Sequence, residues 1–317
     1  MFHALDFTKL GLFPIHSWDA PFHLDGTHVT VEQITGEEQT LRKIQGNGWV
    51  DPDGLRAYLD EERERPGSPC PALVDYEVHQ NHVRLRVTMS EYYEHVAIRR
   101  YLRDHPEEYQ AVADRIGKHD PESDLRSMIR SAPNSNIVIN VTVQSRNGLV
   151  MMLRRSVGAR VWPHFYQAGA HETMNWNATG HPFENAHELA VRALREEVNL
   201  APDDYYNNIK FSWFGFYAPD ASTYLFAHVR SRLEEDELVQ RAIEAESSFE
   251  IDNLDWCPLE EATVRNVINT WQDGPWTAGT DDAGRKYLPH TVMSFVQLWR
   301  VTRTAGSGSL TGMAPGR

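Results

Sequence analysis

The first part of the chain alternates between strand-like and helix-like spacing of its apolar residues. Strand patterns occur at residues 27–34 and on both sides of the sequence HQNH within 74–90, and helical patterns occur at 52–67, 91–102 and 106–132. Pro-Gly ends the helical pattern at 52–67. These patterns predict an α+β domain over residues 1–132, whose role the residues leave open.

A cluster of Pro, Asn and Ser at residues 133–136 predicts a domain boundary, after which strand-like patterns replace the polar helical pattern. Residues 136–156 predict a β-hairpin in which Asn147 and Gly148 supply the positive φ angles of a tight turn. The remaining patterns are a loop-rich stretch at 161–183, a helix at 184–200, a strand pair at 210–231, an acidic helix at 234–247, a strand within 249–262 and two helices up to about 303. The second domain is therefore expected over 133–303, and the Gly- and Ser-rich residues 304–317 predict a disordered tail.

The helix at 184–200 places a carboxylate among apolar side chains. At about 100° per residue, its apolar residues occupy an arc from roughly 140° to 340° when Glu184 is set at zero. Glu196 lies at the edge of this arc, near roughly 120°, and Glu197 lies inside it, near roughly 220°. Because burying an unpaired carboxylate is unfavourable, Glu197 is expected to have an arginine, a donor network or a metal as its partner. Ala193 lies between the two glutamates and is expected to leave room for an ion.

A simpler interpretation of this segment is an ordinary amphipathic helix. Glu188, Arg192 and Glu196 are spaced four residues apart, so they can form ion pairs along the solvated face. Most charged helices need no further explanation than this. Residue spacing alone leaves both interpretations open.

Composition excludes several classes of function. The 317 residues carry a formal net charge of −14, which argues against binding to a nucleic-acid backbone. The two cysteines, Cys70 and Cys257, are too far apart to predict a disulfide framework or a zinc site. The N-terminal residues lack the basic start and unbroken apolar run of a signal peptide, and no segment has about 18 uninterrupted apolar residues. We therefore expect a cytoplasmic protein that binds neither nucleic acid nor a membrane.

The spacing of charged residues in this helix resembles the Nudix hydrolase superfamily. The signature of that superfamily is G-x5-E-x7-R-E-U-x-E-E-x-G-U, where U is a bulky aliphatic residue. Glu184 is followed, after the same gap, by Arg192, Leu194, Glu196, Glu197 and Leu200. The resemblance covers roughly residues 135–300. It implies an α/β/α sandwich with a mixed sheet, preceded here by the smaller α+β domain.

Three positions depart from the signature. Ala178 stands where a glycine is expected, so we assign the family glycine to Gly169 and expect a stretched loop before Glu184. Ala193 replaces the Glu that follows the Arg. Asn199 replaces the late glycine, which a helix end tolerates because Asn also adopts the left-handed conformation. The ending REEVNL and the N-terminal domain also resemble Nudix proteins that act on UDP-glucose.

The resemblance implies a hydrolase that uses Mg²⁺, with Mn²⁺ as an alternative. Such an enzyme cleaves a nucleoside diphosphate linked to another moiety, such as a sugar, by attack of water on phosphorus. By the same resemblance, Glu196 and Glu197 would hold the metal, which usually takes one or two carboxylates together with substrate phosphates and waters. Glu172 and a backbone carbonyl near Ala168 or Gly169 are the further candidate ligands.

The resemblance also implies that Arg192 orients a carboxylate of the signature, with Glu184 as its expected partner. Because Ala193 removes a carboxylate, the general base is expected on another loop, where Glu246 and Glu250 are the candidates. The simpler interpretation of both glutamates is a surface side chain or a structural salt bridge.

Four other residues are candidates for contact with the substrate. Arg154 and Arg155 could reach the phosphates, although one of two adjacent strand residues usually faces solvent. The Gly169 loop lies next to the expected metal, and Trp162 could stack on a base or sugar or could fill the core. The histidines at 164, 171, 181 and 187 fit no zinc signature.

A rival hypothesis is a catalytically inactive Nudix fold that binds a nucleotide and regulates or scaffolds another protein. Ala193 favours this hypothesis, whereas the pair Glu196–Glu197 together with Arg192 favours the enzyme. Fold alone cannot decide between them. Nudix proteins often dimerise, so the resemblance also leaves a homodimer open.

Overall fold

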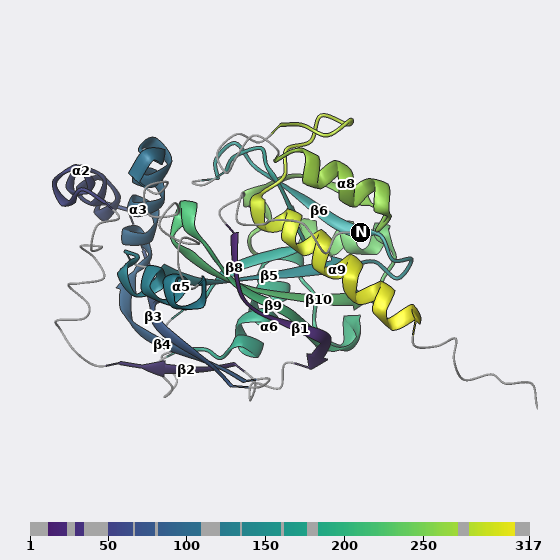
Figure 1. Cartoon of the computed structure of the whole chain (residues 1–317). Coiled ribbons are helices and arrows are strands. Elements are labelled where there is room, and N and C mark those ends of the chain that lie inside the picture. The colour runs from purple at the N-terminus through teal and green to yellow at the C-terminus, as the bar shows by residue number, and fades with distance from the viewer. Residues whose placement is uncertain are drawn as a thin grey trace, which may run out of the picture.

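A sheet of mixed strand direction runs through the molecule (Figure 1). The structure is a computed structural model that describes residues 12–23, 29–34, 50–65, 67–79, 82–108, 121–133, 135–159, 162–175, 183–271 and 279–307. Its strands are β1 (Leu12–His23), β2 (Val29–Gln33), β3 (Pro69–His79), β4 (His82–Glu91), β5 (Ser135–Gln144), β6 (Val150–Arg155), β7 (Tyr166–Ala168), β8 (Ala170–Thr173), β9 (Tyr205–Tyr217), β10 (Ser222–Ser231) and β11 (Ile251–Cys257). Its α-helices are α2 (Pro52–Arg63), α3 (Tyr92–Asp104), α5 (Pro121–Ser131), α6 (Ala186–Val198), α7 (Glu235–Ile243), α8 (Glu261–Asn269) and α9 (Pro289–Ser307). Short 3-10 turns are η3 (Pro202–Asp204), η4 (Ala218–Asp220) and η5 (Ser248–Glu250).

The strand order is β1-β9-β10-β5-β3-β4-β2, with β6, β7, β8 and β11 pairing off this path. Strands β5 and β10 are parallel, as are β2 and β4, and the other pairs are antiparallel. The predicted mixture of α and β elements with a mixed sheet is therefore confirmed. Among the described residues, no helix is long and apolar enough to cross a membrane.

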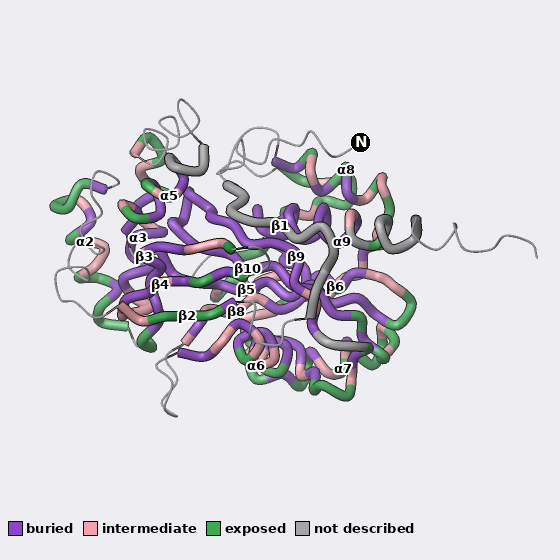
Figure 2. The backbone as a smooth tube through the Cα atoms, turned by 60° about the horizontal axis from the view of Figure 1, so that its bottom comes forward, coloured by how far each residue is buried: buried purple, intermediate pink, exposed green. Residues whose placement is uncertain are grey.

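Strand β5 lies at the centre and is buried along its whole length. Its β-branched side chains alternate between the two faces of the sheet, as strand geometry requires. Ile137 and Ile139 belong to the apolar cluster that includes the buried face of α6, whereas Val138 belongs to the cluster that includes α8 and α9. Figure 2 shows α6 and α7 on one side of the strands and α8 and α9 on the other. Helices thus cover both faces of the sheet.

The strands before and after the expected boundary at 133–136 belong to one sheet. Strand β3 pairs with β5 through Ala72 opposite Asn136 and Leu73 opposite Ser135. The division into domains at residue 133 stays a prediction. Strands β2 and β4 and helices α2, α3 and α5 lie close to the segments that the patterns predicted. Strand β3 begins earlier than predicted, at Pro69, and strand β1 was not predicted. Residues 109–120 of the polar helical region lie outside the described residues.

Two local expectations are wrong. At the predicted hairpin turn only Gly148 has a positive φ angle, +89°, because the turn closes through Gly148 N–H to the Ser145 carbonyl and needs one left-handed residue. The strands then diverge after the single pair Gln144 and Val150, since β6 pairs with β7 and β11. Helix α9 continues past residue 303 to Ser307. The remainder of the predicted tail, 308–317, lies outside the described residues.

Gly169 and Gly148 provide a matched test of backbone crowding. Both have positive φ, +72° and +89°, but a Cβ on Gly169 would lie 2.2 Å from the Val141 carbonyl oxygen, whereas one on Gly148 would meet nothing within 4 Å. We expect Gly148→Ala to lower the free energy of unfolding by about 1 kcal/mol, from backbone strain alone. Gly169→Ala should lower it by about 3 kcal/mol or more, because overpacking adds to the strain. Urea unfolding measures both, and equal losses would contradict this account of the β7–β8 turn.

Candidate functional site

Helix α6 is fixed at both ends by asparagine. At its start, the Asn185 side chain accepts hydrogen bonds from the backbone N–H groups of His187 and Glu188. At its end, Asn199 adopts the left-handed conformation with a φ of +51°, as the sequence predicts. The helix therefore presents a defined face to β5 and β8, against which it packs.

Glu197 lies on the buried face of α6, where its helical position predicts it, and is 5% exposed. Its partner is a donor network, since Gln167 Nε2 donates to Glu197 Oε2 at 3.2 Å and Arg155 donates to Gln167 Oε1 at 3.1 Å. Burial and, to a smaller extent, the nearby carboxylate of Glu172 raise the pKa of Glu197 to about 8. Without a cation nearby, the carboxyl group of Glu197 is therefore mostly protonated at neutral pH.

Arg192 joins the carboxylates around α6. It donates to Glu184 at 3.0 and 2.7 Å and to Glu196 at 3.0 Å, and it lies 3.5 Å from Glu172. It also donates to the carbonyl of Thr173, at the end of β8, at 2.6 Å. The predicted pairing of Arg192 with Glu184 is confirmed, and so is the i,i+4 ion pair of the simpler interpretation. The guanidinium therefore ties α6 to β8 and to the chain before the helix.

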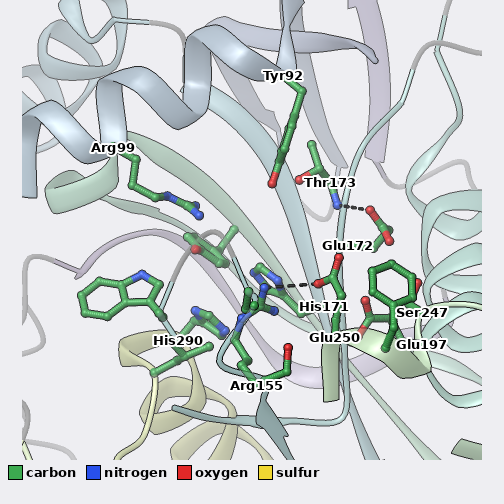
Figure 3. A pocket seen from close by; sticks show the side chains of 17 residues that line it. Tyr92, Arg99, Arg155, His171, Glu172, Thr173, Glu197, Ser247, Glu250 and His290 are labelled. Atoms are coloured by element: carbon green, nitrogen blue, oxygen red, sulfur yellow. Dashed lines mark hydrogen bonds and ion pairs between the residues drawn. The ribbon is translucent and has the colours of Figure 1, made fainter. Parts of the chain in front are cut away.

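A cavity of about 420 Å³ opens beside this network. Glu172, Glu197 and Glu250 line it, from β8, α6 and η5. Figure 3 shows them on one side of the cavity, with Arg99 and His290 on the other. The cavity thus has an acidic side and a side with nitrogen donors.

The structure divides the predicted pairs of candidates between this cavity and the surface. Arg155 lines the cavity and donates to Glu250 at 3.3 Å, whereas Arg154 faces Asp252 at 3.6 Å and is 38% exposed. This alternation is the one expected for adjacent strand residues. Likewise Glu250 lines the cavity, whereas Glu246 is exposed and does not.

Several other predicted residues lie outside the cavity. Glu196 does not line it, and its carboxylate is held by Arg192 and by Arg195. Ala168 and Gly169 are part of the buried β7–β8 turn, where the Gly169 carbonyl accepts a hydrogen bond from the Gln167 side chain. The expected room for an ion beside Ala193 is wrong, because this residue is fully buried in an apolar cluster.

Trp162 lines the cavity and packs edge-to-face on Phe165 and Trp271, with ring centroids 5.1 and 6.3 Å apart. Its φ angle is +53°, an uncommon conformation for a bulky side chain. The His164 backbone is also left-handed, with a φ of +68°. Strain of this kind is common at functional sites, and Trp162 is the one of these two residues that lines the cavity.

Other residues of the cavity wall were not found from the sequence. Tyr92 and Arg99 come from α3, and His290 comes from α9. Tyr92 and Arg99 are two turns apart on α3, so helical spacing alone predicts that they share one face. Nothing in the sequence indicates that this face meets α6 across a cavity.

Arg99 and His290 differ in charge. Arg99 is buried and lies 2.9 Å from Asp220; burial lowers the pKa of the guanidinium, but Asp220 and the neighbouring tyrosines together outweigh burial and the pKa is raised. Burial lowers the pKa of His290 well below its usual value, and Arg99 lowers it further. His171 behaves in the same way, through burial and its neighbour His290. This side therefore combines a charged guanidinium, its counter-ion and neutral imidazoles.

Glu172 and Glu197 fit a hard divalent cation in their chemistry. Both line the cavity, and burial raises the pKa of each, with Arg192 opposing the shift at Glu172. A cation between them would relieve the cost of two carboxylates in a poorly solvated place. In the described part of the chain, no group of three or more His, Cys, Asp or Glu side chains could hold a metal ion. The pair suits an ion that completes its coordination with water and substrate oxygens.

Comparisons with known proteins do not identify a family. No protein-family model matches the chain, and no curated protein matches it by sequence. One of the solved structures that match is a crystal structure of DR0079 from Deinococcus radiodurans, with 17% sequence identity over 47% of this chain and 78% of that chain. Its TM-score is 0.32, at which the likeness carries no argument.

The raised pKa of Glu197 makes a prediction about stability without metal. Because its pKa in the folded state lies above the ordinary value of 4.5, the folded protein binds more protons than the unfolded chain between pH 4.5 and about 8. The free energy of unfolding should therefore fall as pH rises through this range. Glu197→Gln, which resembles the protonated acid, should lack this component.

The measurement is urea unfolding of wild type and Glu197→Gln in a chelator at pH 6 and pH 9. We expect wild type to lose stability relative to the variant as pH rises. A difference between the two proteins that stays constant with pH would show that Glu197 is not held protonated.

Proposed function

We propose that the chain is a Nudix-type pyrophosphohydrolase that depends on Mg²⁺ or Mn²⁺. Its substrate is a nucleoside diphosphate linked to another moiety, and its fold is the α/β/α sandwich of that superfamily. The observation that carries the proposal is the convergence of Glu172 and Glu197 with Arg155 in one cavity. Two buried carboxylates attract a divalent cation, and a guanidinium beside them suits a phosphate.

The chain's own residues would divide the chemistry between them. Glu172 and Glu197 would hold the cation, which neutralises the diphosphate and lowers the pKa of the attacking water. Arg155 would contact a phosphate oxygen from β6. Arg192 lies outside the cavity and acts as a positioning residue, because it holds the end of β8 and thereby the direction of Glu172.

Glu250 is the candidate general base. It lines the cavity and accepts a hydrogen bond from Arg155 through Oε2, which leaves Oε1 to face a water. In the proposed step, the water oxygen forms a bond to one phosphorus as the bridging P–O bond breaks. Glu250 takes the proton of the water, and the products are a nucleoside monophosphate and the phosphorylated second moiety.

A second candidate function is nucleotide binding without hydrolysis. It is favoured by the ion pair between Arg155 and Glu250, since two such groups can neutralise each other instead of acting on a substrate. It is also favoured by Ala193, whose methyl group lies in the core where the signature has a carboxylate. In this case the cavity would hold a nucleotide that regulates or scaffolds another protein.

The direct test is product release with Mg²⁺ or Mn²⁺ from UDP-sugars, ADP-ribose, NADH, dinucleoside polyphosphates and nucleoside triphosphates. We expect turnover of at least one of these, and Glu197→Gln and Glu172→Gln should each lower kcat/KM by about 100-fold or more. Glu188→Gln is the matched control, because Glu188 is exposed on the same helix. Absence of turnover, with nucleotide binding retained, would support the second candidate.

The two candidate bases can be separated by one substitution each. Glu250→Gln should lower kcat about 100-fold or more, the usual contribution of a general base, and should leave KM nearly unchanged. Glu246→Gln should leave both constants unchanged, since its side chain is exposed and outside the cavity. Equal losses in the two variants would mean that neither is the base.

A further inference from the structure

Helix α3 forms one wall of the cavity, although it comes from the region before residue 133. Tyr92 and Arg99 line the cavity from this helix. Arg99 lies 2.9 Å from Asp220 and donates to Ser222 at 3.4 Å, so the helix is tied to the corner between β9 and β10. His290 joins the same wall from α9 (Figure 3). We call Tyr92, Arg99 and His290 the α3 wall.

Buried nitrogens at this wall lack hydrogen-bond partners. Within the described residues, Arg99 Nε, His171 Nε2 and His290 Nε2 are buried and have no partner. Arg99 and His290 are 7% and 3% exposed, and both line the cavity. Buried polar groups in folded proteins are nearly always hydrogen-bonded, and an unpaired one is destabilising. A ligand in the cavity would supply the missing partners.

The imidazole rings are held by stacking. His171 and His290 have ring centroids 4.5 Å apart and planes 8° apart, and Tyr224 stacks on His290 at 5.0 Å and 22°. Packing of this kind fixes the planes of the imidazole rings.

Charge at the α3 wall is balanced. Asp220 forms an ion pair with Arg99 and accepts hydrogen bonds from the Tyr224 hydroxyl and the Ser222 N–H. Burial raises the pKa of Asp220, and these contacts oppose the rise and favour its carboxylate form. The pair of Arg99 and Asp220 therefore adds no net charge, and His290 is neutral through burial, which lowers its pKa. A further phosphate would find no unmatched cation here. A neutral group with hydroxyls would find both donors and acceptors.

We propose that the α3 wall binds an uncharged, hydroxyl-rich moiety of the substrate, a sugar ring joined to the diphosphate. This inference rests on the proposed function, in which the acidic side of the cavity holds the diphosphate. A sugar hydroxyl both donates and accepts, so it matches the His290 imidazole, the Arg99 N–H and the Tyr92 hydroxyl. The region before residue 133 would then set substrate specificity through α3.

The test uses two substrates that differ in the polar groups of one six-membered ring, a hexose ester and a cyclohexyl ester of the same nucleoside diphosphate, with each of the common bases. Wild type should have a kcat/KM at least about tenfold higher for the hexose, because a site built to hydrogen-bond hydroxyls rejects an analogue that lacks them. His290→Phe keeps the stacked ring and removes the nitrogens. It should lower this preference about tenfold by reducing kcat/KM for the hexose alone.

Tyr92→Phe is a second variant, for the case that His290→Phe does not fold. It removes one hydroxyl group from a half-buried ring, so we expect it to fold. It should lower the preference in the same direction by a smaller factor. A preference that is unchanged in both variants, or absent in wild type, would overturn the inference and leave the proposed hydrolysis intact.

If wild type hydrolyses neither compound, the proposed function fails and binding decides the inference. Calorimetry with hydrolysis-resistant methylene analogues of the two esters then makes the same comparison. Tighter binding of the hexose analogue by wild type, lost in His290→Phe, supports a sugar-binding wall. Equal affinities of wild type for the two analogues contradict it.

Discussion

The candidate site depends on one guanidinium. Arg192 binds Glu184 and Glu196, approaches Glu172, and donates to the Thr173 carbonyl, so it fixes α6 against β8. A buried or half-buried charge that satisfies several acceptors is costly to remove, because each acceptor then loses its partner. This network holds Glu172 at the cavity, beside Glu197. Among the described residues, the hydrogen-bond donor to the Glu197 carboxylate is Gln167 and not an arginine.

The cavity gains its two-sided character from elements far apart in the sequence. Its acidic side comes from β8, α6 and η5, and its opposite side comes from α3 and α9. The salt bridge between Arg99 and Asp220 ties α3 to η4, between β9 and β10, and neutralises the charge that α3 introduces. A charged group and a neutral polar group are therefore favoured at different ends of one space, as a diphosphate joined to a sugar would require.

Local patterns in the sequence predicted helix α6 and the burial of Glu197, because both follow from periodicity within one segment. They missed β1 and the short strands β7 and β8, which lie in the stretch interpreted as loop-rich. They also predicted that one of Arg154 and Arg155 faces solvent. They could not find Arg99 or His290, since these reach the cavity through tertiary packing that no local spacing encodes. The Asn-Gly turn was predicted wrongly in detail because β6 pairs with other strands, so the turn is not constrained as a regular hairpin.

The central claim is that Glu172 and Glu197 form the protein part of a cation site for a diphosphate. Anomalous diffraction from crystals grown with Mn²⁺ and a methylene-bridged nucleotide sugar tests it most directly. The account predicts a manganese peak between these two carboxylates, in contact with a phosphate oxygen, in wild type and its loss in Glu197→Gln. A nucleotide bound in the cavity with no peak at these carboxylates would contradict it.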